Sequence, residues 1–269
     1  MPASEAVDLT EIAARLAACV REAGLLARSM FGTPVKNWTK GESSPVSEAD
    51  IAVDQLLHER LTGEGSDFGW LSEESLDDPA RLASRYVWIV DPIDGTRAYL
   101  ASQPDWAVSA ALVENGRPIL ACLYAPVTDE FFMATVGKGA TRNNAPITAT
   151  RGTSLAHARV AGPKSFLERL AKSAPPFTVV PRTRSLALRL ARVAQGDYDV
   201  AIAGVDSHDW DLAAADLLVH EAGGALTAIG GGTVIYNRPV LRHGMLVAAG
   251  RDRHAALVEL FRDERLASS

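Results

Sequence analysis

The chain is poor in cysteine. Cys19 and Cys122 are the only two cysteines among 269 residues, and each lies in an apolar stretch, so we interpret both as small core residues. Their number and spacing exclude a disulfide framework and a cysteine-based zinc site. This composition is typical of a reducing compartment, and we expect a cytoplasmic protein.

The sequence also lacks long apolar runs and blocks of positive charge. No run approaches the roughly 18 apolar residues of a membrane-spanning helix. The opening residues, MPASEAVDLTE, lack the basic start and apolar core of a signal peptide. The net charge of −6, with no basic cluster, argues against binding to a nucleic-acid polymer or to a membrane surface. A hydrophobic content of 47% is instead typical of a folded globular protein.

The hydrophobic pattern changes near residue 150. Before it, two helical patterns, the second capped by Ser47, precede a series of strands with a hairpin signal at residues 114–117. The polar stretch at 37–45 is expected to be a loop. After it, short strands alternate with helices, which is typical of an α/β unit. We therefore expect an α+β domain at 1–150 and an α/β domain at 151–269.

Acidic residues gather where apolar segments end. They are Glu73, Glu74, Asp91, Asp94 and Asp211. Carboxylates as near as Asp91 and Asp94 repel each other unless a cation or a proton lies between them. If Glu73 and Asp211 converge on this pair, the four acids form an all-oxygen cage, which suits Mg²⁺ and, next, Mn²⁺.

A candidate phosphate site follows these acids directly. Gly95 and Thr96 open the segment TRAYL, which is expected to start a helix with free N–H groups at its N-terminus. Metal ions beside a phosphate site suggest metal-assisted phosphoryl hydrolysis.

Each of these acids also has a simpler interpretation. Asp209 or Asp211 would serve as a helix cap, and Asp50 would complete a capping box with Ser47. Glu73 and Glu74 alone are compatible with a solvated loop. Arg97 is equally compatible with the surface and with a contact to a second anionic group. The combination of acids at the edges of apolar segments favours a functional site.

Four motifs resemble those of the inositol monophosphatase superfamily of Mg²⁺-dependent, lithium-sensitive phosphatases. The first and second signature motifs are matched by WIVDPIDGT and WDLAAADLLVHEAGG, and two further segments are matched by SEES and KGESSPVSEAD. The matches run in order from about residue 40 to residue 224. The resemblance implies a layered α-β-α-β-α sandwich, commonly a homodimer, that acts on a small phosphorylated substrate.

The resemblance also implies roles for individual residues. Glu73, Asp91 and the main-chain carbonyl of Ile93 would hold a first Mg²⁺ ion, and Asp91, Asp94 and Asp211 a second, with two or three ions in all. Asp94 and Asp211 would also contact the substrate.

The remaining roles concern the phosphate and the water. Gly95 and Thr96 would bind the phosphate oxygens, and Thr96 with Asp50 would orient or deprotonate the attacking water. Attack would be in line and direct, without a phospho-enzyme. Arg97 would contact the substrate if it faces the site.

One departure from the family pattern bears on the substrate. Inositol-hydrolysing members carry a glutamate at a position that falls here on Ala203 or Gly204, and Asp206 would replace it only through a loop shift. Inositol monophosphate or a similar polyol or sugar phosphate is the first expectation. A 3'(2'),5'-bisphosphate nucleotidase and a histidinol-phosphate phosphatase are alternatives, and a catalytically silent metal- and phosphate-binding regulator is a remote one.

Overall fold

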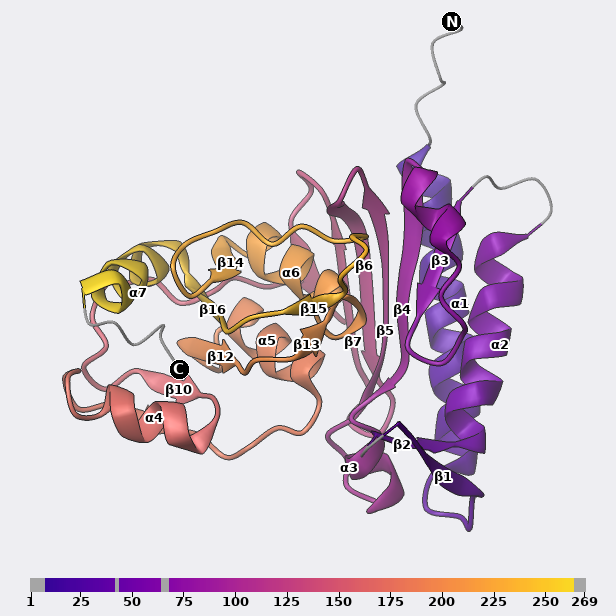
Figure 1. Cartoon of the computed structure of the whole chain (residues 1–269), viewed down its shortest axis with the longest axis horizontal. Helices are drawn as coiled ribbons and strands as arrows, with labels where there is room; N and C mark the ends of the chain where they lie inside the picture. The colour runs from indigo at the N-terminus through magenta and orange to yellow at the C-terminus, as the bar shows by residue number, and fades with distance from the viewer. Residues whose placement is uncertain (1–7, 42–43, 64–67, 264–269) are drawn as a thin grey trace, which may run out of the picture.

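The computed structural model describes residues 8–41, 44–63 and 68–263. The acidic N-terminal segment 1–7 and residues 42–43 of the expected loop lie outside the described residues. Five layers follow one another across the molecule in Figure 1: a helix pair, a large sheet, a second helix pair, a smaller sheet and an outer helix pair. The expected α-β-α-β-α sandwich is confirmed.

The large sheet is built from the first half of the chain. Its strands, in spatial order, are β3 (Gly69–Ser72), β4 (Tyr86–Asp94), β5 (Ala107–Glu114), β6 (Arg117–Ala125), β7 (Glu130–Thr135), β8 (Ala140–Arg142) and β9 (Ala145–Pro146). All neighbours pair antiparallel except β3 and β4, and the pairing of β5 with β6 confirms the hairpin expected at residues 114–117.

Both faces of this sheet are covered by helices. Trp88 and Val90 of β4 belong to the core formed with α1 (Leu9–Met30) and α2 (Glu48–Thr62), whereas Ile89 packs toward α5 (Leu186–Ala194) and α6 (Asp209–Glu221). Successive side chains of a strand point to opposite faces, so a strand covered on both sides needs an unbroken apolar run. That requirement explains the sequence YVWIV.

The smaller sheet is built from the second half of the chain. Its strands, in spatial order, are β11 (Thr178–Val179), β10 (Arg159–Ala161), β12 (Val200–Ala203), β16 (Leu246–Gly250) and β14 (Gly224–Ala228). The pairs β11–β10 and β10–β12 are parallel, and the other two pairs are antiparallel. The alternation of strands and helices is therefore present, but in a mixed sheet. The division of the chain into an α+β domain at 1–150 and an α/β domain at 151–269 stays a prediction.

The remaining elements surround these layers. They are α4 (Lys164–Leu170) and α7 (Arg251–Asp263) on the outside, the short helices α3 (Thr96–Leu100) and η1 (Pro79–Ala83), and the two-stranded ribbons β1 (Asn37–Lys40) with β2 (Ser44–Ser47) and β13 (Ser207–His208) with β15 (Arg242–His243). The expectation of a loop at 37–45 is wrong, because β1 and β2 pair antiparallel. None of the helices in the described part of the chain has the length and apolar character that crossing a bilayer requires.

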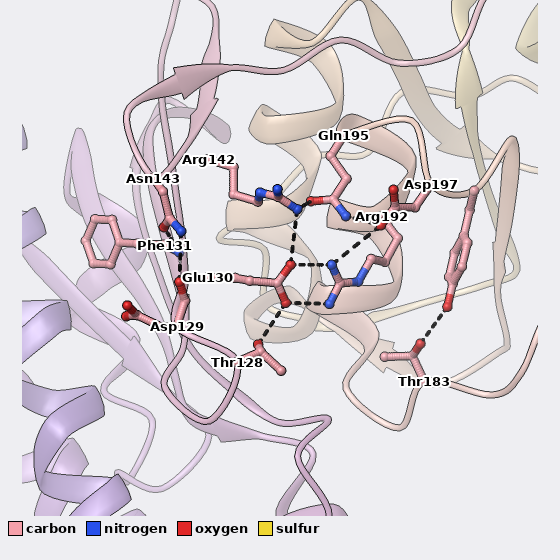
Figure 2. A network of polar contacts seen from close by, with 11 residues as sticks. Thr128, Asp129, Glu130, Phe131, Arg142, Asn143, Thr183, Arg192, Gln195 and Asp197 are labelled. Carbon is pink, nitrogen blue, oxygen red and sulfur yellow. Dashed lines mark hydrogen bonds and ion pairs between the residues drawn. The ribbon is translucent and has the colours of Figure 1, made fainter.

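An ion-pair cluster joins the large sheet to α5 (Figure 2). Glu130, at the start of β7, accepts hydrogen bonds on its two oxygens from the two terminal nitrogens of Arg192 at 2.5 and 2.6 Å. Thr128 donates to the same carboxylate at 2.8 Å, and Arg142 lies 3.4 Å away. Burial raises the pKa of Glu130, but the hydrogen bonds from Arg192 and Thr128 outweigh it, and the net pKa is lowered.

We expect Glu130→Gln to lower the free energy of unfolding by about 2–3 kcal/mol, because it removes the two-bond ion pair and leaves the half-buried Arg192 with the exposed carboxylate of Asp197, 3.6 Å away, as its counter-charge. Urea unfolding at pH 7 measures this loss. The lowered pKa means that Glu130 stabilises the fold above its unfolded pKa, and the effect disappears as the pH falls through the folded pKa. Glu22→Gln, which removes a solvent-exposed partner of Arg60, is the matched control and should have little effect. Equal losses in both variants would contradict a role for the cluster.

Candidate active site

An irregularity at the end of β4 turns two acids to one side. Asp91 pairs with Ser109 and Asp94 with Ala107, so three steps along β4 oppose two along β5. In a regular strand, the side chains of residues three apart point to opposite faces of the sheet. The one extra residue in β4 between Asp91 and Asp94 lets both side chains point to the same side. As a result, Asp91 and Asp94 are both buried and their carboxylates lie close together.

A third acid comes from the second half of the chain. Carboxylate oxygens of Asp91, Asp94 and Asp211 all lie within 4.8 Å of one another. Asp211 is in the first turn of α6, where its carboxylate also accepts a hydrogen bond from the main-chain N–H of His208 at 2.7 Å. The helix-cap interpretation of Asp211 is therefore confirmed, and its place beside Asp91 and Asp94 is compatible with a role as a metal ligand, which stays a prediction.

The fourth acid, Glu73, follows β3 directly. It lines a cavity of about 530 Å³ together with the other three acids and with residues of the β4–α3 connection. Lys40 Nζ lies 3.2 Å from the carboxylate of Glu73 and 2.8 Å from that of its neighbour Glu74. Burial raises the pKa of Glu74 to about 7. Glu73 is among the described residues that line the cavity and Glu74 is not, and the preference for Glu73 as a metal ligand stays a prediction.

The four acids disfavour one another's charge. Burial raises the pKa of Asp91 well above its usual value, and the charges of Glu73 and Asp94 raise it further. Burial and the charge of Asp94 likewise raise the pKa of Asp211, against a lowering by the hydrogen bond from His208. Burial raises the pKa of Asp94 to about 6 despite hydrogen bonds that lower it. A cation among these oxygens would relieve the repulsion, so the residues present fit a metal ion with hard oxygen ligands.

Asp94 also joins the two halves of the chain. It accepts hydrogen bonds from the Ser185 hydroxyl at 2.5 Å, from the Ala187 N–H at 2.6 Å and from the Leu186 N–H at 3.2 Å. A carboxylate is favourable at the N-terminus of a helix, here α5. The sequence analysis missed these contacts, because nothing in the segment RTRSLAL indicates which acid it meets.

Glycine is required between Asp94 and α3. Gly95 has a φ of +99°, and a Cβ atom there would lie 3.1 Å from the carbonyl oxygen of Asp105 and 3.3 Å from the nitrogen of Ser185. Any other residue would be strained in this conformation and crowded by its neighbours. The tight turn places Thr96, the first residue of α3, at the same cavity.

Asp50 completes the capping box of α2 and also contacts Thr96. One carboxylate oxygen accepts hydrogen bonds from the N–H and the hydroxyl of Ser47, which caps α2 as expected. The other accepts one from the Thr96 hydroxyl at 3.1 Å. The same hydroxyl lies 3.1 Å from the carbonyl oxygen of Ile93. Burial raises the pKa of Asp50.

Hydrogen bonds from the loop after β3 fix the position of Glu73. Asp54, buried in α2, accepts hydrogen bonds from the hydroxyls of Ser72 and Ser75, each at 2.5 Å. Both serines flank the acidic pair in SEES, so α2 holds this loop from both sides. The sequence analysis did not identify Asp54, although its one-turn spacing from Asp50 on the same helix was a usable signal.

Other candidate residues take different positions. Arg97 lines the cavity, as do Arg182 and Arg184, which the sequence analysis missed. Asp206 is exposed, has a φ of +71° and lies 3.6 Å from Arg242, and it is not among the described residues that line the cavity. Asp209 is buried and accepts hydrogen bonds from Asn237 N–H and His243, which is a structural role.

Comparisons with known proteins agree with this geometry. The sequence model of the inositol monophosphatase family matches residues 8–266. An inositol-1-monophosphatase of Caulobacter vibrioides is 31% identical over 234 residues, which cover 83% of this chain and 89% of the relative. The Nus factor SuhB of Salmonella typhimurium is 30% identical, with 91% of this chain and 93% of the relative covered.

Solved structures share the fold. The extragenic suppressor protein suhB from Bartonella henselae superposes with a TM-score of 0.82 at 27% identity, covering 94% of this chain and 99% of that one. The inositol monophosphatase from Anabaena gives a TM-score of 0.76 at 26% identity, with 95% and 96% covered. A family match over nearly the whole length, around a cluster of buried acids, leads to one conclusion: the chain belongs to the inositol monophosphatase family of metal-dependent phosphatases.

Proposed function

We propose that the chain is an Mg²⁺-dependent phosphomonoesterase that hydrolyses a small phosphate ester by direct attack of water. The observation that carries this proposal is the convergence of Asp91, Asp94 and Asp211 within 4.8 Å, in a cavity that Glu73 and Thr96 also line. Acids alone would repel a phosphate ester, so the site needs cations to be useful.

The all-oxygen donor set supports Mg²⁺, with Mn²⁺ as a substitute. Glu73, Asp91 and the Ile93 carbonyl would hold one ion, and Asp91, Asp94 and Asp211 would hold another, with room for two or three in all. When bound, the ions would lower the pKa of water and neutralise charge on the phosphate and the leaving alkoxide.

Asp50 and Thr96 would move the proton of the attacking water. When the Thr96 hydroxyl donates to Asp50, its oxygen is left to accept a hydrogen bond from water. Burial raises the pKa of Asp50, which makes its carboxylate a stronger base. The Ser47 hydrogen bonds keep the Asp50 side chain fixed during this step.

The phosphate would be bound next to the water. Gly95 and Thr96 would direct main-chain N–H groups at the phosphate oxygens, with Arg97 at the cavity edge as a further cation. No serine or cysteine is among the described residues that line this cavity, so neither of these residue types offers a covalent nucleophile there.

Phosphate release from a substrate panel tests the proposal. With Mg²⁺, the purified protein should release phosphate from at least one of inositol 1-phosphate, adenosine 3',5'-bisphosphate and histidinol phosphate, and chelation of the metal should stop it. Relatives named inositol-1-monophosphatase make the first substrate the natural start. Absence of release from all three, or binding without turnover, would contradict the proposal and favour a silent binder.

Asp91→Asn should separate catalysis from folding. We expect kcat/KM to fall on the order of 10³-fold or more, because a ligand shared by both ions is lost. In EDTA at pH 7.5 the variant should be more stable than the wild type by on the order of 1–3 kcal/mol, since one of four repelling charges is gone. Activity assays and urea unfolding measure these effects, with the exposed Asp206→Asn as control. A destabilised variant, or retained activity, would contradict the assignment.

The metal-free protein should lose stability as the pH rises. Because the folded-state pKa of Asp94 is raised to about 6, its favourable contribution is complete below its unfolded pKa of about 4 and is lost as the pH rises through 6. The melting temperature in EDTA should therefore fall between pH 5 and pH 7.5, and Asp91→Asn should reduce that fall. An identical pH dependence in the variant would show that repulsion at this site is unimportant.

Asp50→Asn and Thr96→Val should lower kcat by about 10²–10⁴-fold, the usual contribution of general acid–base catalysis. Mg²⁺ affinity should change far less, because neither side chain belongs to the proposed ligand set. Steady-state kinetics and calorimetric titration with Mg²⁺ distinguish the two effects. Glu59→Gln, an exposed change on the same helix, is the control. A loss of Mg²⁺ binding that accounts for the whole rate effect would contradict the proton-transfer role.

Three further expectations from the sequence, two of them implied by the family resemblance, remain predictions. They are a homodimer, inhibition by lithium and a cytoplasmic location. Light scattering and titration of the active enzyme with LiCl address the first two.

A further inference from the structure

The loop that carries Glu73 receives little support from the sheet itself. Glu73 directly follows β3, an edge strand of the large sheet whose one neighbour among the described strands is β4 (Figure 1). Its N–H donates to the carbonyl oxygen of Val90 in β4 at 3.3 Å, and its carbonyl oxygen accepts a hydrogen bond from Lys40 at 2.7 Å. Because the chain leaves the sheet at this point, side chains from other elements determine where the loop lies.

Asp54 of α2 binds this loop on both sides of Glu73. The Ser72 hydroxyl donates to one oxygen of the Asp54 carboxylate and the Ser75 hydroxyl to the other, each at 2.5 Å. Ser72 directly precedes Glu73, and Ser75 comes shortly after it. The two hydrogen bonds therefore hold the main chain before and after the acid.

Both hydroxyls need an acceptor at this place. The Ser75 oxygen accepts a hydrogen bond from the indole nitrogen of Trp70 at 3.2 Å, and the Ser72 oxygen accepts one from the main-chain N–H of Glu74 at 3.3 Å. A serine hydroxyl has one hydrogen, and each of these serines uses it on Asp54. A carboxylate accepts on both of its oxygens, whereas an asparagine amide would accept one of the two hydrogen bonds and present a donor to the other serine.

The negative charge of Asp54 has no cation beside it to offset its burial. Asp54 is buried, and it makes no ion pair with any residue in the described parts of the chain. Burying a carboxylate without a cation lowers the stability of a fold. We therefore interpret this side chain as one that serves to hold the loop in place more than to stabilise the protein.

The same helix also holds the proposed proton-transfer pair. Asp50 lies one turn before Asp54 in α2, and residues four apart share one face of a helix. Asp50 accepts a hydrogen bond from the Thr96 hydroxyl at 3.1 Å. Thr96 and Glu73 both line the acidic cavity. One face of α2 is therefore connected to Thr96 through Asp50 and to the loop of Glu73 through Asp54.

We propose that Asp54 is a positioning residue that holds Glu73 at a fixed separation from the Asp50–Thr96 pair. With both contacts in place, α2 keeps the proposed Mg²⁺ ligand and the proposed proton-transfer groups in one arrangement before any ligand binds. Asp54 is not among the described residues that line the cavity, so it acts through the two serines. This inference rests on the proposed phosphatase activity and adds a residue to the machinery behind it.

Calorimetric titration of the full chain with Mg²⁺ tests this role. Asp54→Asn, and separately Ser72→Ala combined with Ser75→Ala, should each weaken Mg²⁺ binding about tenfold or more, the usual effect of losing a side chain that orients a metal ligand. Only the first of these variants removes a negative charge, so equal losses exclude a purely electrostatic cause. All three changes together should weaken binding no more than either variant does, because the side chains act through the same contacts.

Asp78→Asn is the matched control. It makes the same change of charge at an exposed position between β3 and β4, so Mg²⁺ affinity should stay within about twofold of the wild type.

Two further readouts distinguish positioning from a general role in stability. The rise in melting temperature that Mg²⁺ causes should be smaller in Asp54→Asn than in the wild type, because tighter binding to the folded state stabilises it more. A merely structural role would lower the melting temperature equally with and without Mg²⁺. The value of kcat at saturating Mg²⁺ should fall less than the Mg²⁺ affinity, the reverse of the pattern expected for Asp50→Asn.

The outcomes separate this inference from the proposed function. A wild-type protein that binds no Mg²⁺ would overturn the proposed function, and this inference with it. Mg²⁺ binding by the wild type with the same affinity in both variants would overturn this inference alone. So would a loss in Asp54→Asn that the serine variant does not share, because charge would then account for it.

Discussion

Repulsion among buried carboxylates at the end of β4 is the constraint on which the rest of this site depends. Asp91 and Asp94 are held on one side of the sheet by a single extra residue in β4, and Asp211 and Glu73 approach from two other elements. Burial and mutual charge raise the pKa values of Asp91, Asp94 and Asp211. Buried carboxylates this close together lower the stability of the fold unless cations lie between them. We therefore interpret the cluster as a binding site for cations.

The five-layer fold supplies the rigidity that this arrangement needs. α6 lies between the two sheets, and its run of alanine and leucine is buried on nearly every side, so Asp211 at its start has a fixed position. The N-terminus of α5 holds Asp94, and the pairing of Glu130 with Arg192 fixes the same helix further along. The two halves of the chain are thus joined by two contacts. One is between Asp94 and the N-terminus of α5, at the acidic cavity, and the other is between Glu130 and Arg192, further along the same helix.

Local patterns in the sequence predicted the features that depend on residues close together in the chain. The Ser47–Asp50 spacing indicated a capped helix, and the structure has one at α2. The acids could be proposed as one cluster because each ends an apolar segment. The contact of Asp94 with α5, the ribbon at 37–47 and the arginines before α5 depend on long-range packing that no local pattern contains. The mixed pairing of the smaller sheet has the same origin.

The location of bound metal tests the central claim most directly. Crystals soaked in Mn²⁺ and measured by anomalous scattering would reveal each ion without any assumption about the substrate. The account predicts anomalous peaks within coordination distance of Asp91, shared with Glu73 on one side and with Asp94 and Asp211 on the other. Crystals with no peak among these acids, at a Mn²⁺ concentration that supports phosphate release, would contradict it.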